Sequence, residues 1–264
     1  MTAVAGRRAA VPGWVSPLAG VVGVLAAWEL LALTVFGGGN AVPTPQGVVS
    51  QLADDGWAFY GPHVRGTASE ALRGFLWGNA VAVAMALLVI LVPPLERVVT
   101  QLAVASYCLP IIAVGPILTV VFDGDTPMVA LSALSVVFTT LIGMLAGLRA
   151  ADKASLDVVR AYGGGRWALL RRVRLTAALP AAFTALKIAA PAAVLGAIIG
   201  EFMGRVPAGL GLAMIVAQQQ LNVERTWGVA LVAGALAGAA YALIALAGRL
   251  ATPWARAGTP GGGR

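Results

Sequence analysis

The side chains that could perform chemistry in this sequence are few, and they lie far apart. His63 is the only histidine and Cys108 the only cysteine, which argues against a histidine-built metal site and rules out an internal disulfide. The two lysines, Lys153 and Lys187, follow an aspartate and a leucine, so neither completes the Gly-Lys-Ser/Thr sequence of a phosphate-binding loop. We therefore expect no catalytic residue, no metal site, no bound cofactor and no ATPase centre in this chain.

Three charged residues lie inside long apolar stretches and are the remaining candidates for function. A charge at the middle of a membrane helix costs roughly 2.5–3.5 kcal/mol, so we expect Glu29 to face other helices and Lys187 to extend toward the membrane surface. Lys187 and Glu201 share one stretch but stand about 21 Å apart along a helix, too far for an ion pair. Glu201 has two open interpretations: an interfacial residue, or a gate in a substrate pathway.

A basic and partly polar segment, residues 154–180, separates two of the apolar stretches. Apolar residues at helical spacing predict a short amphipathic helix capped by Ser155, and the glycines at 163–165 end it. A second short helix is predicted over residues 166–174, and we expect Pro180 in the first turn of the next apolar helix. The simplest interpretation is a cytosolic loop whose arginines only set the orientation of the chain in a membrane.

The composition places the rest of the chain in a bilayer. Of 264 residues, 59% are hydrophobic and only 11% are charged, and the mean hydropathy is +0.87. A soluble domain of this size needs far more charge to cover its surface. The net charge of +7 is distributed between apolar stretches rather than along one soluble face, which argues against nucleic acid as a partner.

Six apolar stretches predict an all-α membrane protein with about six transmembrane helices. Pro110 and Pro116 lie in the third stretch, where they either only kink the helix or line a pathway where it bends. A short helix is predicted over residues 46–60, and an external helix beginning near Gly209 is predicted within the polar segment 206–222. The six stretches cover residues 18–36, 70–92, 98–122, 127–148, 181–202 and 227–248.

Positive charges predict the orientation of these helices. With both chain ends inside, the cytoplasmic segments hold thirteen of the arginines and lysines, and the outside segments with their helix ends hold only Arg65, Arg73, Arg205 and Arg225. Cytoplasmic loops are enriched in Lys and Arg, so this bias predicts an N-in, C-in arrangement. The basic segment then lies in the cytoplasm.

The order of residues in the basic segment resembles the cytoplasmic EAA loop of permease subunits in bacterial ABC importers. That pattern has an acidic residue and two alanines, a glycine six positions after the acid, and then isoleucine, any residue, leucine and proline. Thr176 departs from it at the first proline. The matching positions are Asp157, Val158 and Val159 for the acid and alanines, Gly163 for the glycine, Val173 and Leu175 for the aliphatic residues, and Pro180 for a second proline common in the nitrate, sulfonate and taurine branch.

The resemblance implies a type I ABC importer permease of the bacterial plasma membrane. In that family the loop forms coupling helices that dock into an ATPase subunit, so Asp157, Arg160 and Gly163 become the leading coupling residues. The implied partners are an ATPase that uses ATP and Mg, an external substrate-binding protein and a second permease copy in a homodimer. Pro110, Pro116 and Glu201 become candidates for the translocation pathway.

The resemblance also implies a substrate class and a division of the chain. The substrate would be a small anion such as a sulfonate, taurine or nitrate. Residues 1–62 would hold the cytoplasmic N-terminus, the first transmembrane helix and an external segment; 63–250 the permease domain with coupling loop 149–180; and 251–264 a flexible cytoplasmic tail. The alternative is an ion-coupled secondary transporter or small-solute channel independent of ATP, for which a buried ion-binding cluster is expected.

Overall fold

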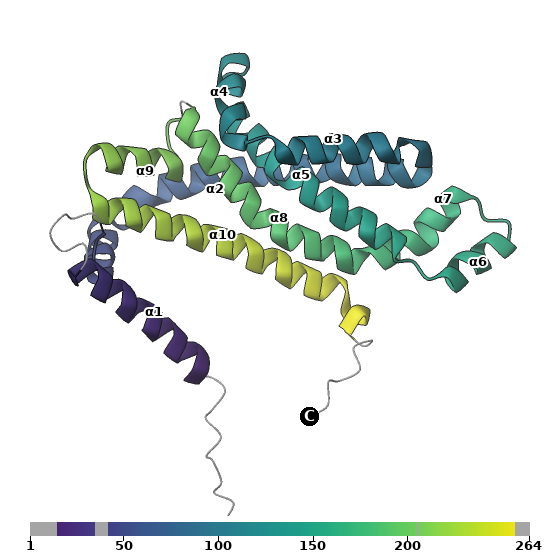
Figure 1. The fold of residues 1–264 in the computed structure, drawn as a ribbon, viewed down its shortest axis with the longest axis horizontal. Helices are drawn as coiled ribbons and strands as arrows, with labels where there is room; N and C mark the ends of the chain where they lie inside the picture. Colours follow the sequence, from purple (N-terminus) through teal and green to yellow (C-terminus); the bar gives the residue numbers. More distant parts are fainter. Residues whose placement is uncertain (1–14, 35–41, 205, 257–264) are drawn as a thin grey trace, which may run out of the picture.

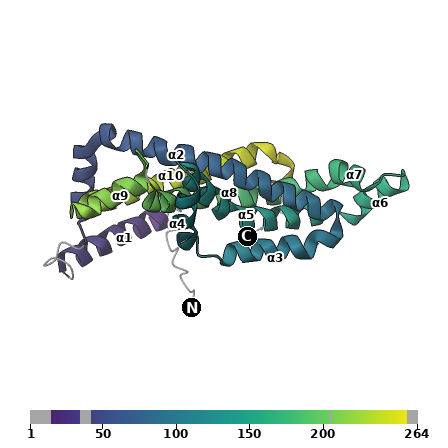
Figure 2. The ribbon, with the colours of Figure 1, turned by 90° about the horizontal axis from the view of Figure 1, so that it is seen from above.

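A computed structural model describes residues 15–34, 42–204 and 206–256, and every regular element in these ranges is helical. The expected positions of the N-terminal arginines and of the flexible tail after residue 256 lie outside the described residues. Figure 1 shows α8 and α10 side by side along the long axis of the molecule, with α6 and α7 at one end and α9 at the other. The turned view in Figure 2 keeps the same two ends apart.

The helices follow one another with short connections. In chain order they are α1 (Val15–Thr34), α2 (Pro45–Leu91), η1 (Pro93–Leu95), α3 (Glu96–Cys108), α4 (Ile111–Val121), α5 (Thr126–Arg149), α6 (Lys153–Ala161), α7 (Arg166–Leu169), the wider π-helical turn η2 (Leu170–Arg174), α8 (Leu175–Met203), α9 (Leu210–Gln219), α10 (Val223–Ala251) and η3 (Pro253–Arg256).

Four helical segments in the described part of the chain are long and apolar enough to cross a membrane. They are α2, α5, α10 and the continuous segment Arg166–Met203, which joins α7, η2 and α8. The prediction of an all-α membrane fold is confirmed. The first expected span begins in α1, whose apolar part, Leu18–Thr34, is shorter than these four and is not among the segments long enough to cross a membrane.

The third expected span, residues 98–122, is wrong as a single helix. The chain forms α3 and α4 instead, which meet at an angle of 94°. Pro110 causes the break, because a proline disfavours helical geometry in the residue before it and Leu109 is accordingly extended at φ −70° and ψ 125°. Pro116, in contrast, lies inside α4.

The second span also differs from the prediction. The expected helix 46–60 and the expected span 70–92 belong to one long helix, α2, that bends at Gly56. Gly56 has φ 58° and ψ −174°, a conformation that side-chain-bearing residues rarely adopt. Thr44 caps the start of α2 by accepting a hydrogen bond from the backbone N–H of Gly47 at 3.1 Å.

Small residues bring α5 and α8 close together at the centre of the molecule. A Cβ added to Gly147 would lie 2.9 Å from the carbonyl oxygen of Ala178, and one added to Gly143 would collide with Ala185. Without glycine at these positions the two backbones could not approach so closely. The neighbouring apolar core joins the ends of α2, α3, α5 and α8 through residues that include Val89, Leu141 and Leu148.

Candidate functional site

The segment between α5 and α8 forms the two short helices that the sequence predicts, α6 and α7. The cap of α6 is Asp152 rather than Ser155: its carboxylate accepts a hydrogen bond from the backbone N–H of Ser155 at 3.1 Å. Leu156 and Leu169 are buried against each other's helices and form a small apolar cluster there. This cluster fixes the angle between α6 and α7.

The turn after α6 depends on glycine. Gly163 has φ 77°, in the left-handed region that favours glycine. The N–H of Gly164 donates to the carbonyl of Val159 at 2.9 Å, and a Cβ on Gly164 would lie 2.7 Å from that same oxygen. Both glycines therefore let the chain reverse immediately after α6, so that α7 can return toward the membrane-spanning helices.

One face of the α6–α7 segment makes few contacts with the rest of the fold. Val158, Tyr162 and Trp167 are exposed, and Tyr162 has 89% of its surface accessible. Asp157 and Arg160 form an ion pair at 2.8 Å, with both side chains more than half exposed. Exposed aromatic and charged groups on a rigid helical hairpin are suited to docking against another protein.

Three further positions of the EAA-like pattern pack against the interior. Val159 and Val173 pack against the small cluster around Leu156, and Leu175 packs against the core at the ends of the spanning helices. The structure thus separates the pattern into partner-accessible residues, Asp157 and Arg160 with Val158, and internal ones. This division could not be read from the sequence order alone.

Pro180 does not lie in the first turn of a helix. The helix is continuous from Arg166 to Met203, and Pro180 is an interior residue of α8. Proline lacks the N–H that would bond the preceding turn, and membrane helices tolerate this where other groups compensate. The hydroxyl of Thr184 donates to the carbonyl of Pro180 at 2.9 Å. The π-helical turn η2 is the irregular part of this long helix.

Glu201 lies at the opposite end of the molecule from α6 and α7, and the residue is only 1% exposed. The hydroxyl of Thr67 donates to its carboxylate at 2.6 Å, and the N–H of Gly211 donates to the second oxygen at 2.5 Å. Thr67 also accepts from the N–H of Leu210 at 2.8 Å. Glu201 therefore fastens the start of α9 to α2 and α8.

Glu70 belongs to this cluster, although the sequence did not identify it. It is buried near Glu201, and its Oε2 atom has no hydrogen-bond partner among the described residues. The only available signal was Glu70 at the edge of an apolar stretch, with Thr67 one helical turn before it.

The other predicted pathway residues do not join Glu201. Pro110 and Pro116 are exposed on α4, whereas Glu201 is enclosed by α2 and α9. The link between them is indirect: Gly115 of α4 is buried against the side chain of Met203 near the end of α8. Lys187 is half-buried on α8 and Glu29 half-buried on α1.

Two ion pairs hold the outer turns of the fold, and the sequence did not predict either. Arg73 pairs with Asp125 at 2.5 Å, and hydrogen bonding from its guanidinium holds the pKa of Asp125 below the usual range. Arg225 at the start of α10 donates two hydrogen bonds to Asp55 in α2, at 2.6 and 2.9 Å. Both pairs connect helices that are distant in sequence.

Several helices long enough to cross a membrane, with an exposed helical hairpin at one end, define the class of this protein: a multi-pass membrane protein with a surface suited to docking. Residues 78–256 match the family described as binding-protein-dependent transport system inner membrane component. The chain belongs to this family, the inner-membrane permease subunits of ABC importers.

Three curated relatives agree. A probable ABC transporter permease protein of Haemophilus influenzae is 32% identical over 77% of this chain and 83% of its own length. The formylaminopyrimidine transport permease protein of Halalkalibacterium halodurans is 28% identical over 67% of this chain and 71% of its own. The riboflavin transport system permease protein of Chloroflexus aurantiacus is 30% identical over 59% of this chain and 58% of its own length.

Family membership decides several of the predictions. The chain is a multi-pass inner-membrane protein and a transport subunit rather than an enzyme, and the family implies an ATPase partner and a substrate-binding protein. The alternative of a transporter independent of ATP does not fit this family. None of the three relatives' names mentions a sulfonate, taurine or nitrate.

Proposed function

We propose that this chain forms the translocation pathway of an ATP-driven importer and is coupled to its ATPase through the exposed face of α6 and α7. The proposal rests on the contrast between exposed charged residues and buried apolar residues within the EAA-like segment. Asp157 and Arg160 are exposed and, within the described part of the chain, pair with each other, whereas Leu156 and Leu169 hold the hairpin rigid from inside. A rigid element with a free polar face can transmit the movement of a partner to the helices behind it.

The coupling end lies in the cytoplasm in this proposal, with both chain termini on the same side. The arginine bias and the need for the segment to reach a cytosolic ATPase support this orientation. The ATPase binds ATP and Mg, a second copy of this chain completes the pathway, and residues 63–250 are the permease domain. The α4 helix, with Pro110 at its start and Pro116 inside it, lines the pathway, while Glu201 holds α9 in place beside it.

The substrate we propose is a nitrogen heterocycle of the vitamin-precursor type rather than a small inorganic anion. Two relatives are named for formylaminopyrimidine and riboflavin transport, and both names describe nitrogen heterocycles. The small anion expected from the EAA-like pattern finds no such support. Purified binding protein encoded beside this chain should be stabilised against heat by a pyrimidine or a flavin and not by taurine or nitrate; the reverse result would restore the anion.

Co-purification tests the coupling proposal. The tagged chain should retain its ATPase in mild detergent, and Asp157→Arg should reduce the retained ATPase at least about ten-fold, because it repels Arg160 and changes the charge of the docking face. Asp54→Arg, an exposed position at the opposite end of the molecule, is the matched control and should retain the ATPase.

Glycine variants refine the same test. Gly163→Val should also release the ATPase because valine resists a φ of 77°, whereas Gly163→Asn should keep it because asparagine tolerates the left-handed region. Retention of the ATPase by both Asp157→Arg and Gly163→Val would show that α6 is not the docking element.

A further inference from the structure

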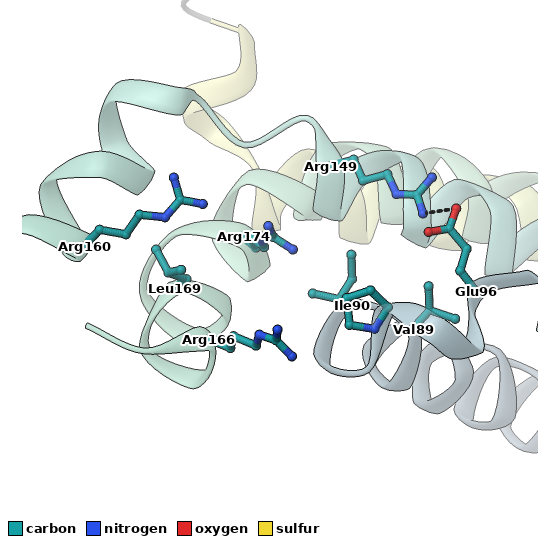
Figure 3. Close-up of a pocket in the computed structure, with 9 residues that line it drawn as sticks. Val89, Ile90, Glu96, Arg149, Arg160, Arg166, Leu169 and Arg174 are labelled. Carbon is teal, nitrogen blue, oxygen red and sulfur yellow. Dashed lines mark ion pairs between the residues drawn. The ribbon is translucent and has the colours of Figure 1, made fainter. Parts of the chain in front are cut away.

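A cavity beside the α6–α7 segment gathers arginines from several elements. It has a volume of about 300 Å³ and lies between the end of α2, the start of α3 and the base of the α6–α7 hairpin. Figure 3 shows its lining. The charged residues that line it are Glu96, Arg149, Arg160, Arg166 and Arg174.

The positive charge of this cavity exceeds what its own acidic residue can neutralise. Glu96 pairs with Arg149 at 2.6 Å, and Arg160 pairs with Asp157, which lies outside the lining. Arg166 donates only to a neutral group, the carbonyl of Leu91, at 3.2 Å. Two guanidinium groups, those of Arg166 and Arg174, therefore form no ion pair with a carboxylate in the described part of the chain.

Arg174 gives the strongest indication of a missing ligand. Its Nε atom is buried and has no hydrogen-bond partner in the described part of the chain. A buried donor of a charged group is costly to leave unpaired. In Figure 3 the guanidinium groups of Arg166 and Arg174 both point toward the end of α2, where Ile90 lies. An anion in the cavity that both residues line would supply the negative charge that both groups lack.

We propose that this cavity binds the phosphate group of an anionic phospholipid. Planar guanidinium groups bind phosphate oxygens through paired hydrogen bonds, and basic pockets at the cytoplasmic ends of membrane helices are suited to lipid headgroups. The lining also contains Val89, Ile90 and Pro93, which belong to the end of a spanning helix and its first turn. These apolar groups would contact the glycerol and the first methylenes of the lipid.

The location gives the lipid a role. The phosphate would bridge Arg166 and Arg174, at the base of the coupling hairpin, to the end of α2. The lipid would thereby hold the hairpin at a fixed angle to the spanning helices. The proposed orientation of the chain decides only which leaflet supplies the lipid. Binding of the phosphate by the cavity does not depend on that orientation.

The test measures lipid binding to the purified, delipidated full chain without any ATPase, so its outcome is independent of the coupling experiment. The probes are short-chain phosphatidylglycerol below its micelle concentration, short-chain phosphatidylcholine and inorganic phosphate. We expect phosphatidylglycerol to bind best, and Arg174→Gln or Arg166→Gln to weaken it about ten-fold or more, as expected for loss of a charge-assisted hydrogen bond. Arg171→Gln and Arg172→Gln, exposed positions outside the lining, should bind like the unmodified chain.

Several results would overturn the proposal. Equal weakening by the control variants would mean a general attraction to positive charge rather than a site. Inorganic phosphate binding as tightly as phosphatidylglycerol would exclude the lipid as the preferred source. Binding of the ATPase that depends on Arg174, with no lipid binding, would assign the cavity to the protein partner. Arg174→Lys keeps the positive charge but lacks the planar guanidinium group. Partial lipid binding by this variant would show that the protein is still folded and that the weaker binding of Arg174→Gln comes from the site itself.

Discussion

Thr67 connects three segments through one hydroxyl group. It donates to Glu201 at 2.6 Å and accepts from the N–H of Leu210 at 2.8 Å, and it is fully buried. A hydroxyl used in both directions cannot be replaced by an apolar group without leaving a donor and an acceptor unpaired. Glu201 and Leu210 each lie more than 130 positions from Thr67 in the sequence, so this single side chain stabilises long-range contacts.

Replacing Thr67 by valine should therefore destabilise the protein. The shape is nearly conserved, but the N–H of Leu210 loses its partner, which costs about 1–3 kcal/mol. The measurement is the free energy of unfolding in mixed detergent micelles. Thr67→Ser keeps the hydroxyl and should retain most of the stability; a larger loss in Thr67→Ser than in Thr67→Val would mean that the methyl group, not the hydrogen bonds, matters.

Close packing of helices α5 and α8 depends on which glycines face a neighbour. A Cβ on Gly147 would meet backbone atoms of α8, whereas one on Gly238 of α10 would have nothing within 4 Å. The sequence contains glycine pairs at four-residue spacing in both helices, Gly143 with Gly147 and Gly234 with Gly238. Of these two pairs, the one in α5 lies at a tight helix contact and the one in α10 has nothing within 4 Å.

Gly147→Ala and Gly238→Ala should accordingly have opposite effects. The first forces a methyl group against the carbonyl of Ala178 and should cost about 1–3 kcal/mol. The second should be neutral or stabilise by up to about 1 kcal/mol, because alanine favours a helix more than glycine does. Thermal unfolding midpoints in one detergent compare the two; a lower midpoint for Gly238→Ala would indicate that α10 packs against something there.

The whole molecule is joined from end to end by one helix. The segment Arg166–Met203 has 38 residues, which corresponds to roughly 57 Å, and it runs from the α6–α7 hairpin to the cluster around Glu201. A movement imposed on α7 is therefore applied directly to the far end of α8. In the proposed importer this helix transmits ATPase closure to the outer face.

Two glycines inserted after Arg174 should interrupt this transmission. The insertion makes the junction between η2 and α8 flexible but leaves the exposed face of α6 intact. In proteoliposomes with the ATPase and the binding protein, ATP hydrolysis should continue while uptake falls by about ten-fold or more, since rigid-body coupling is lost. Uptake that remained proportional to hydrolysis would argue against α8 as the transmitting element.

Much of the fold was predictable because its signals are local. Long apolar stretches predict the spanning helices, and the glycines around Gly163 predict the turn after α6. The predictions failed where a local signal had two outcomes: Pro110 breaks a helix, while Pro116 and Pro180 remain inside one. Which outcome occurs depends on neighbouring helices that compensate for the missing N–H.

The sequence by itself determined an all-α membrane protein with a basic helical hairpin, because hydrophobicity, helical periodicity and glycine turns act over a few residues. Only the tertiary structure decided what surrounds Glu201 and where the arginines gather. Glu201 acquires its partners from α2 and α9, and the arginine cavity is assembled from α5, α6, α7 and η2 against the end of α2. These groups are distant along the chain, and close packing of helices through small residues brings them together.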